Sequence, residues 1–131
     1  MDEWKSPNRQ HLAKWKWGGE MWMSGPEWGY LTVDGIHEYK GAAPLALWSD
    51  DSKYLAFVVL HIQDVPNRKG AEGFTYRVAI LRLSDFQRRV CLGNHKLAKV
   101  GLESFHGGVL TLSVSGRPHQ IRVESIEWES A

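Results

Sequence analysis

Six histidines are the residues of this chain best suited to metal ligation or acid–base chemistry. No two of them stand at the i, i+2 or i, i+4 spacing that puts both imidazoles on one metal ion locally. A site assembled across strands stays open, because strand pairing can join distant residues. The sequence nevertheless predicts no metal and no cofactor. The six are His11, His37, His61, His95, His106 and His119.

Two short patterns resemble parts of hydrolytic sites. Cys91 and His95 offer a thiol and a base in one stretch, but a catalytic pair also needs a stabilised thiolate and an oxyanion site. A buried structural thiol is therefore the prediction for Cys91. His106-Gly107-Gly108 has the composition of an esterase oxyanion turn, yet the chain has no Gly-x-Ser-x-Gly nucleophile elbow. These residues are predicted to form a turn.

Two groups of carboxylates could supply the acid and the base of glycoside hydrolysis. Asp50 and Asp51 lie in a tight-turn sequence that favours Asp for its own backbone hydrogen bonds. Glu124, Glu127 and Glu129 alternate with apolar residues as on a solvated strand edge. Both groups therefore have a structural interpretation, and no catalytic residue is predicted.

The tryptophans carry the functional signal. Five of the seven fall within the first 28 residues, and we assign the other two, Trp48 and Trp128, to the core. We expect some of the five to stay partly exposed, where Trp is enriched at binding hot spots. A protein partner, a glycan and single-stranded nucleic acid would each fit such a surface, although the charge balance weakens the third. The five are Trp4, Trp15, Trp17, Trp22 and Trp28.

The elements that position these tryptophans have two interpretations. Ser6-Pro7 suits the start of a short helix, with Leu12 and Trp15 on one face and Gly18-Gly19 as its end. Alternation of Lys and Trp over residues 14–17 instead favours a strand. The two alternatives stay open at this point.

From Gly29 onward the pattern predicts strands. Asp34-Gly35 predicts the tight turn of a hairpin between residues 30–33 and 36–39. Residues 45–48 form the next expected strand. Residues 54–62 and 74–83 are apolar on both faces and should pair as central strands, joined by a long polar loop over Gln63–Gly73.

The last third predicts four further strands over residues 88–92, 97–105, 109–114 and 120–128. Leu110, Leu112 and Val114 should face inward. The apolar phase shifts after Val123, which predicts a β-bulge near Glu124-Ser125.

The segment Leu45–Leu92 resembles one blade of a β-propeller of the type found in Tol-system periplasmic proteins and prolyl-oligopeptidase-like enzymes. The resemblance lies in Trp48-Ser49-Asp50-Asp51-Ser52-Lys53 followed by an apolar strand, where the family has Trp-Ser-Pro-Asp-Gly-Lys. Arg77–Leu83, Ser84–Gln87 and Arg88–Val90 resemble the later strands of the blade. The resemblance implies a four-stranded meander and not a closed propeller, because 131 residues cannot supply the roughly four blades of 40–45 residues that closure needs. It implies no functional residue, since the blade motif is itself structural.

Composition limits the setting and the partners. Sixteen Lys and Arg oppose fifteen Asp and Glu, a formal net charge of +1, so no long-range field favours nucleic acid or an anionic membrane. The single Cys91 and a charged start without a signal-like apolar run favour a cytoplasmic protein. The longest apolar run is also too short for a membrane helix.

Together these patterns predict a single all-β domain, an antiparallel meander of about eight to ten strands forming a sandwich or half-open barrel. The predicted function is a small protein-binding module, an inhibitor or immunity-type protein that occludes a toxin or an enzyme. Self-association through the aromatic segment is a further possibility. A ligand-binding or enzymatic barrel with a small-molecule or glycan pocket, using His61, Tyr76 or His106, is the alternative. The predicted contact residues are Trp15, Trp17, Trp22, Trp28, Asp64, Arg68, Lys69 and Glu72.

Overall fold

The computed structural model describes residues 2–20, 27–62, 74–95 and 100–128. These ranges contain ten strands and one 3-10 turn, and no α-helix forms within them. The predicted all-β class is therefore confirmed. The elements are β1 (Asp2–Lys5), β2 (Leu12–Glu20), β3 (Glu27–Val33), β4 (His37–Trp48), β5 (Tyr54–Ile62), β6 (Phe74–Arg82), β7 (Gln87–His95), β8 (Val100–His106), β9 (Val109–Val114), β10 (Arg117–Arg122) and η2 (Val123–Ser125).

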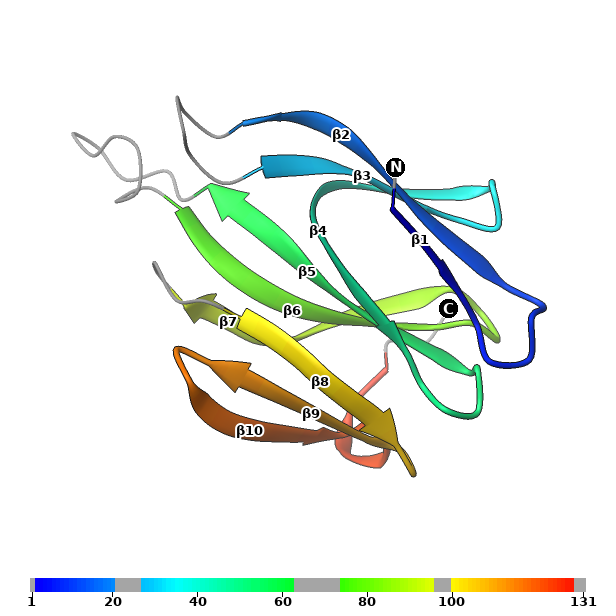
Figure 1. Ribbon diagram of the computed structural model, residues 1–131. Coiled ribbons are helices and arrows are strands. Elements are labelled where there is room, and N and C mark those ends of the chain that lie inside the picture. The colour runs from blue at the N-terminus through cyan, green and yellow to red at the C-terminus, as the bar shows by residue number, and fades with distance from the viewer. Residues whose placement is uncertain (1, 21–26, 63–73, 96–99, 129–131) are drawn as a thin grey trace.

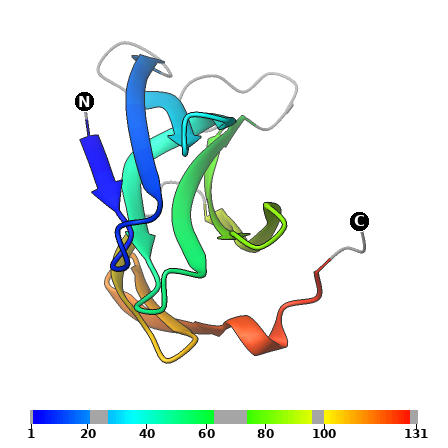
Figure 2. The same ribbon diagram turned by 90° about the vertical axis from the view of Figure 1, so that its right-hand side faces the viewer.

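The strands form two antiparallel sheets. One has seven strands in the order β1 to β7, and the other has three in the order β10-β9-β8. Neither sheet closes into a barrel; Figure 1 shows the larger sheet curling, and Figure 2 shows the smaller sheet lying beneath it. β5 pairs with β6 from Tyr54–Arg82 to Ile62–Phe74, as their apolar patterns predict.

The larger sheet curls at β4. The first half of this strand pairs with β3 and the second half with β5, with an irregular stretch between Ala42 and Ala46. Gly41 has a φ of +84°, which glycine adopts without strain, and Pro44 has no N–H to give to a ladder. Figure 1 shows the resulting sharp bend, which brings the two halves of the sheet to face each other.

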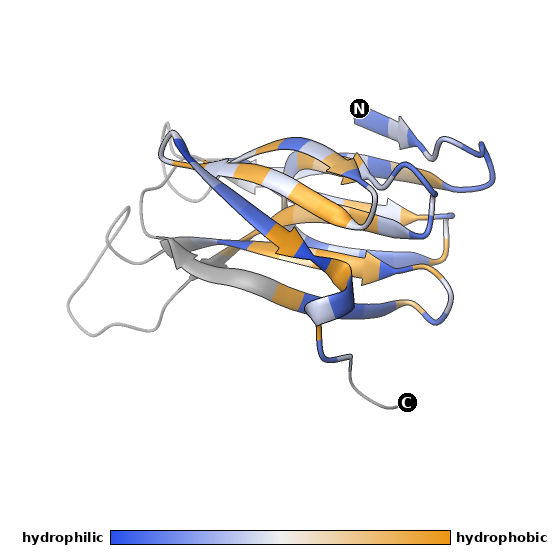
Figure 3. Cartoon of the chain, turned by 90° about the horizontal axis from the view of Figure 1, so that it is seen from below, coloured by the Kyte–Doolittle hydropathy of each residue, from blue (hydrophilic) through white to orange (hydrophobic). Residues whose placement is uncertain are grey.

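Two cores result, and β5 and β6 separate them. Leu55, Phe57, Ala79 and Leu81 pack inside the curled sheet with residues of β2 to β4. On their opposite faces, Ala56, Val78 and Ile80 pack against Phe105, Leu110 and Leu112 of the smaller sheet. Burial on both faces explains why the central residues of β5 and β6 are apolar on both faces, whereas Figure 3 shows apolar and polar bands alternating along other strands.

The expected hairpin at Asp34-Gly35 forms, with φ values of +56° and +68° at these two residues. It joins β3 to β4 through the Val33–His37 pair. Positive φ at both central positions is what a tight hairpin turn requires. The local sequence therefore determines this turn.

At the N-terminus the strand interpretation is correct and the helix alternative is wrong. Lys14 and Lys16 are exposed while Ala13 and Trp15 are buried, the period of two that a sheet with one wet face produces. Ser6 does not start a helix. Its hydroxyl donates to Asn8 Oδ1 (2.7 Å) and accepts from the backbone N–H of His11 (3.0 Å), which closes the turn between β1 and β2.

The C-terminal strand is shorter than predicted. β10 ends at Arg122, and the turn η2 replaces the expected bulge near Glu124-Ser125. The Ser125 hydroxyl donates to the carbonyl oxygen of Arg122 (2.7 Å) and stabilises this turn. The turn, not a bulge, produces the shift in apolar phase. Within the described ranges, no helix has the length and apolar character to cross a bilayer.

Candidate functional site

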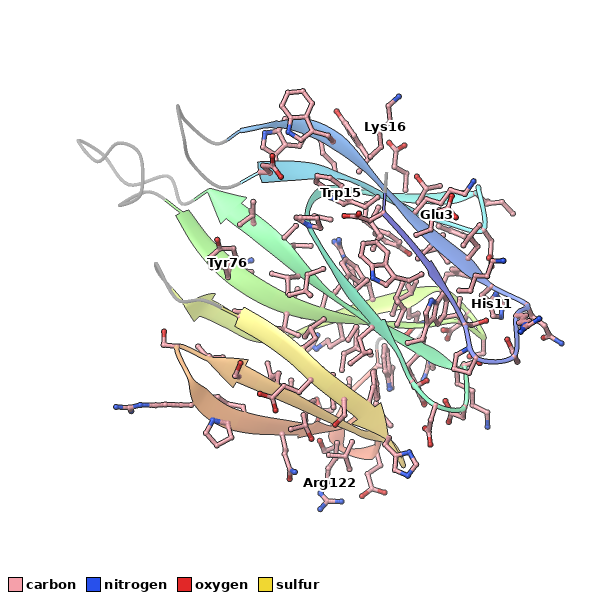
Figure 4. The ribbon with its side chains drawn as sticks, viewed as in Figure 1. Glu3, His11, Trp15, Lys16, Tyr76 and Arg122 are labelled. Atoms are coloured by element: carbon pink, nitrogen blue, oxygen red, sulfur yellow. The ribbon has the colours of Figure 1, made fainter. Side chains whose placement is uncertain are left out.

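A row of side chains crosses the outer face of β2, β3 and β4. Lys16 pairs with Tyr30, and Tyr30 pairs with Lys40. Directly opposite residues of antiparallel strands point to the same face, so the two lysines flank the tyrosine. Figure 4 shows Lys16 and Trp15 on opposite sides of β2, with Lys16 outside the fold. Both lysines are exposed and Tyr30 is half-buried.

Trp28 extends this row into an aromatic surface. Its ring lies over Gly18 and Gly19, where an added Cβ would come within 2.5 and 3.1 Å of the indole. The ring meets Tyr30 edge-on at 5.6 Å, and the Lys40 ammonium lies 5.7 Å from its centroid. Trp28 is half-buried. We call Lys16, Trp28, Tyr30 and Lys40 the lysine–aromatic face.

Trp17 is exposed near the end of β2, on the side of the sheet opposite to Lys16. It follows Trp15 by two residues and so continues on the inner side of β2, but 54% of its surface is accessible against 6% for Trp15. A register shift between Trp17 and Gly19 marks the place where β2 leaves the core. The adjoining ends of β2 and β3 therefore carry one accessible tryptophan on each side.

The other tryptophans with described side chains contribute to packing. Trp15 is buried, and its indole Nε1 donates to the carbonyl oxygen of Ala42. Trp48 is buried as predicted and donates to the carbonyl oxygen of Trp4 (2.8 Å). Trp128 is half-buried and packs with the second core.

The structure brings two of the predicted contact residues, Trp17 and Trp28, to neighbouring strand ends. It places Trp15 in the core, since its position on β2 faces the centre of the fold. The other predicted contacts lie outside the described residues: Trp22, Asp64, Arg68, Lys69 and Glu72.

A depression of about 500 Å³ opens at the opposite end of the strands. The turns β1–β2, β4–β5 and β6–β7 meet there, at the right-hand side of Figure 1. His11, labelled in Figure 4, lies at its rim with Nδ1 2.7 Å from Asp34 Oδ2, and its ring stacks on Trp48. This is the arrangement of a base held by an orienting carboxylate. The residues that line the depression are Asn8, His11, Asp51–Tyr54 and Arg82–Ser84.

Several polar groups that line this depression are hydrogen-bonded to other groups of the chain. The Ser52 hydroxyl accepts from the backbone N–H of Asn8 (2.9 Å), and the Arg82 guanidinium binds both oxygens of Asp85. Buried or half-buried groups that are paired in this way stabilise turns. The hydrogen bonds around the depression therefore stabilise the turns that border it.

A second histidine–carboxylate pair connects the two sheets. Asp50 Oδ2 lies 2.7 Å from His106 Nδ1, and the backbone N–H of Asp50 donates to the carbonyl oxygen of Phe105 (2.9 Å). The Gly107 N–H also donates to Asp50 Oδ1 (3.3 Å). Gly107, expected in a turn, is in one, and its N–H binds a carboxylate of this chain.

Two residues named for the alternative, a ligand or enzyme site, lie on different sheets: Tyr76 on β6 and His106 at the end of β8. Tyr76 is half-buried on β6, and burial raises the pKa of its phenol above the ordinary value of 10.0, so the phenol stays neutral. His106 is exposed on the β8–β9 turn. The side chains of His61, Cys91 and His95 lie outside the described part. Among the side chains that the structure describes, no three His, Cys, Asp or Glu gather into a possible metal site.

Sequence reasoning missed the lysine–aromatic face as a unit. The Lys-Trp-Lys-Trp alternation signalled exposed lysines on β2, but Lys40 lies 24 positions beyond Lys16 in the chain. Only the register of two strand pairs aligns them. No family model, curated protein or solved structure matches the chain significantly.

Proposed function

We propose that this protein is a small protein-binding module that acts as an inhibitor or immunity-type protein, occluding a partner such as a toxin or an enzyme. The observation that carries the proposal is the accessible aromatic surface at the ends of β2 and β3. Trp17 is 54% exposed there, and Trp28 and Tyr30 lie on the other side.

Trp28 suits an anchor because its ring is already positioned. Gly18 and Gly19 lie against one face of the indole and Tyr30 against its edge, so little side-chain freedom remains to be lost on binding. A tryptophan held in this way contributes large contact area at low entropic cost. Trp17 supplies a second anchor on the opposite side, so the paired strand ends would enter a partner's cleft with an aromatic ring on each side.

The charged residues Asp64, Arg68, Lys69 and Glu72 stay predicted contacts that set orientation and association rate. Self-association is a variant of the same proposal, in which the second copy of the chain is the partner. A cytoplasmic location also stays a prediction.

A small-molecule pocket at the depression beside His11 is the second candidate. Its volume of about 500 Å³ falls within the range of ligand sites. The hydrogen bonds that already occupy His11, Ser52 and Arg82 favour the binding module over this candidate. Thermal stabilisation of the protein by a small molecule or glycan, lost in His11→Ala, would favour the pocket.

The decisive experiment is a native pull-down from the source organism's lysate, with captured proteins quantified by mass spectrometry. We expect one saturable partner with the wild-type chain and strongly reduced capture with Trp17→Ala and Trp28→Ala. Ile36→Ala is the matched control, since Ile36 is 78% exposed at the far end of β3. Equal capture by all four proteins would contradict the proposal.

A further inference from the structure

We infer that the lysine–aromatic face binds an acidic segment of the partner protein, one that places carboxylates on both sides of an apolar or aromatic group. This inference rests on the proposed function and specifies the chemistry of the partner. It depends on the alignment of Lys16, Tyr30 and Lys40 across three strands.

The alignment fixes the spacing of the backbone positions that carry the two lysines. Neighbouring strands lie about 4.8 Å apart, so side chains on the first and third strands of a row are separated by roughly 10 Å. Tyr30 lies between them, with Trp28 packed against its ring. A ligand that spans this row meets an ammonium, an aromatic surface and a second ammonium in turn.

Neither ammonium has a carboxylate partner among the residues that the structure describes. Within the described part of the chain, Lys16 forms no ion pair, and Lys40 has Trp28 as its neighbour, in a cation–π contact. Lys14, on the same side of β2, differs because its Nζ lies 3.8 Å from Glu3. The next row on this face pairs Lys14, Thr32 and Glu38, so its carboxylate, that of Glu38, belongs to a neighbouring row and not to the row of Lys16 and Lys40.

Charge complementarity identifies carboxylates as the matching groups. An ammonium donates to carboxylate oxygens and adds favourable charge, which sets orientation and association rate at the rim of an interface. Tyr30 and Trp28 would take up the apolar atoms between the two acids. Nucleic acid fits less well, because its grooves combine aromatic rings with a long basic track, whereas this face has two unpaired lysines and the chain a formal charge of +1.

The test is a titration of the ¹⁵N-labelled protein with an oligo-glutamate peptide that contains interspersed prolines and one tryptophan. We expect shifts at the amides of Lys16, Tyr30 and Lys40, and binding that weakens as salt rises. The double variant Lys16→Glu/Lys40→Glu should bind about tenfold more weakly, which corresponds to about 1.4 kcal/mol. Arg117→Glu, exposed on β10, is the matched control and should bind as the wild type does.

Several outcomes would overturn the inference. The first two are the absence of peptide binding and chemical-shift changes confined to other strands. The other two are an affinity of the double variant equal to that of the wild type, and an affinity for a peptide with glutamine in place of glutamate equal to that for the oligo-glutamate peptide. Tighter binding of oligothymidine at the same residues would replace the acidic segment with nucleic acid. Because the variants act on exposed side chains, unchanged unfolding midpoints confirm that each variant is folded.

The pull-down separates the two proposals. Loss of capture with Trp28→Ala but not with Lys16→Glu/Lys40→Glu would preserve the binding module and reject the acidic segment. Loss of capture with both variants supports the binding module and the acidic segment alike. Unchanged capture with both variants and with Trp17→Ala rejects the proposed function, and the peptide titration then decides whether the face binds carboxylates at all.

Discussion

The indole Nε1 of Trp15 donates a hydrogen bond to the carbonyl oxygen of Ala42 at 2.9 Å. Ala42 lies where β4 leaves β3 and joins β5, at the start of an irregular stretch of the ladder. Both residues are buried. The tryptophan therefore fills the core and also satisfies a backbone group at the bend that gives the larger sheet its curl.

Replacing Trp15 should destabilise the fold far more than replacing Trp17. Trp15→Ala removes a buried ring and should cost about 3–5 kcal/mol, while Trp15→Phe removes the hydrogen bond to the Ala42 oxygen and should cost about 1–3 kcal/mol. Trp17→Ala, at an exposed position, should change the free energy of unfolding by about 0.5 kcal/mol or less. Urea denaturation measures all three. Similar costs for Trp15→Ala and Trp17→Ala would contradict the assignment of one to the core and the other to the surface.

Two glycines of the β2–β3 pair should differ in their tolerance of alanine. A Cβ at Gly29 would overlap the backbone carbonyl oxygen of Lys16 and come within 2.6 Å of the buried Trp15 ring, so Gly29→Ala should destabilise by about 1–3 kcal/mol or more. A Cβ at Gly18 meets the half-exposed Trp28 ring, which can move outward at smaller cost. Thermal unfolding compares the two variants.

The Gly18→Ala variant also tests whether binding needs the position of the Trp28 ring. Because Gly18→Ala displaces the indole while keeping it in the chain, it should weaken capture of the partner with little loss of stability. Gly116→Ala is the control for a strained glycine replacement away from Trp28: its φ of +79° makes alanine unfavourable there, but its added Cβ meets nothing within 4 Å and the residue lies in the β9–β10 turn of the smaller sheet. Normal capture by Gly18→Ala would show that the packed position of the Trp28 ring is not needed.

Those parts of the fold that depend on local pattern could be predicted from the sequence. β5 and β6 are apolar on both faces, and the structure buries both faces. Asp34-Gly35 has the residue types that a tight hairpin turn demands. In each case the signal lies within one strand or one turn, so tertiary context did not need to be known.

The rest depends on contacts between distant segments. Trp15 and Trp17 have the same side-chain phase and each follows a lysine, and only the extent of the core decides that one is buried and the other exposed. The alignment of Lys16 with Lys40 depends on register shifts next to Gly29 and Trp17. A shift of one residue would move either lysine to the opposite face, and composition does not reveal it.

The two central strands should be the most protected against hydrogen exchange. β5 and β6 pair over nine residues and lie between both cores, so the amides of Phe57 and Ala79 should exchange only through global unfolding. β1 is a four-residue edge strand with mostly exposed side chains, and the amide of Trp4 should exchange by local opening. Native-state exchange followed by NMR measures these rates. Equal protection of Trp4 and Phe57 would contradict the assigned order of stability.

The turn between β4 and β5 should make stability depend on acid pH. Burial pushes the pKa of Asp51 up, but the Ser49 hydroxyl (2.6 Å), the Lys53 N–H and the Lys53 charge outweigh it and hold the pKa below its ordinary value of 3.8. Ser49 is itself buried and its hydroxyl also accepts from the Tyr54 N–H (2.9 Å). The charged form of Asp51 is therefore favoured by folding.

Because the pKa of Asp51 is lower in the folded chain than in the unfolded chain, its contribution is fully present above the unfolded pKa. It is lost as the pH falls from about 4 through the folded pKa. Asp51→Asn should be less stable than the wild type at pH 7, and the difference should shrink as the solution is acidified. Urea unfolding at a series of pH values checks this, with Glu38→Gln as the control at an exposed strand position. A difference between wild type and Asp51→Asn that stays constant down to about pH 2 would show that the carboxylate charge does not stabilise this turn.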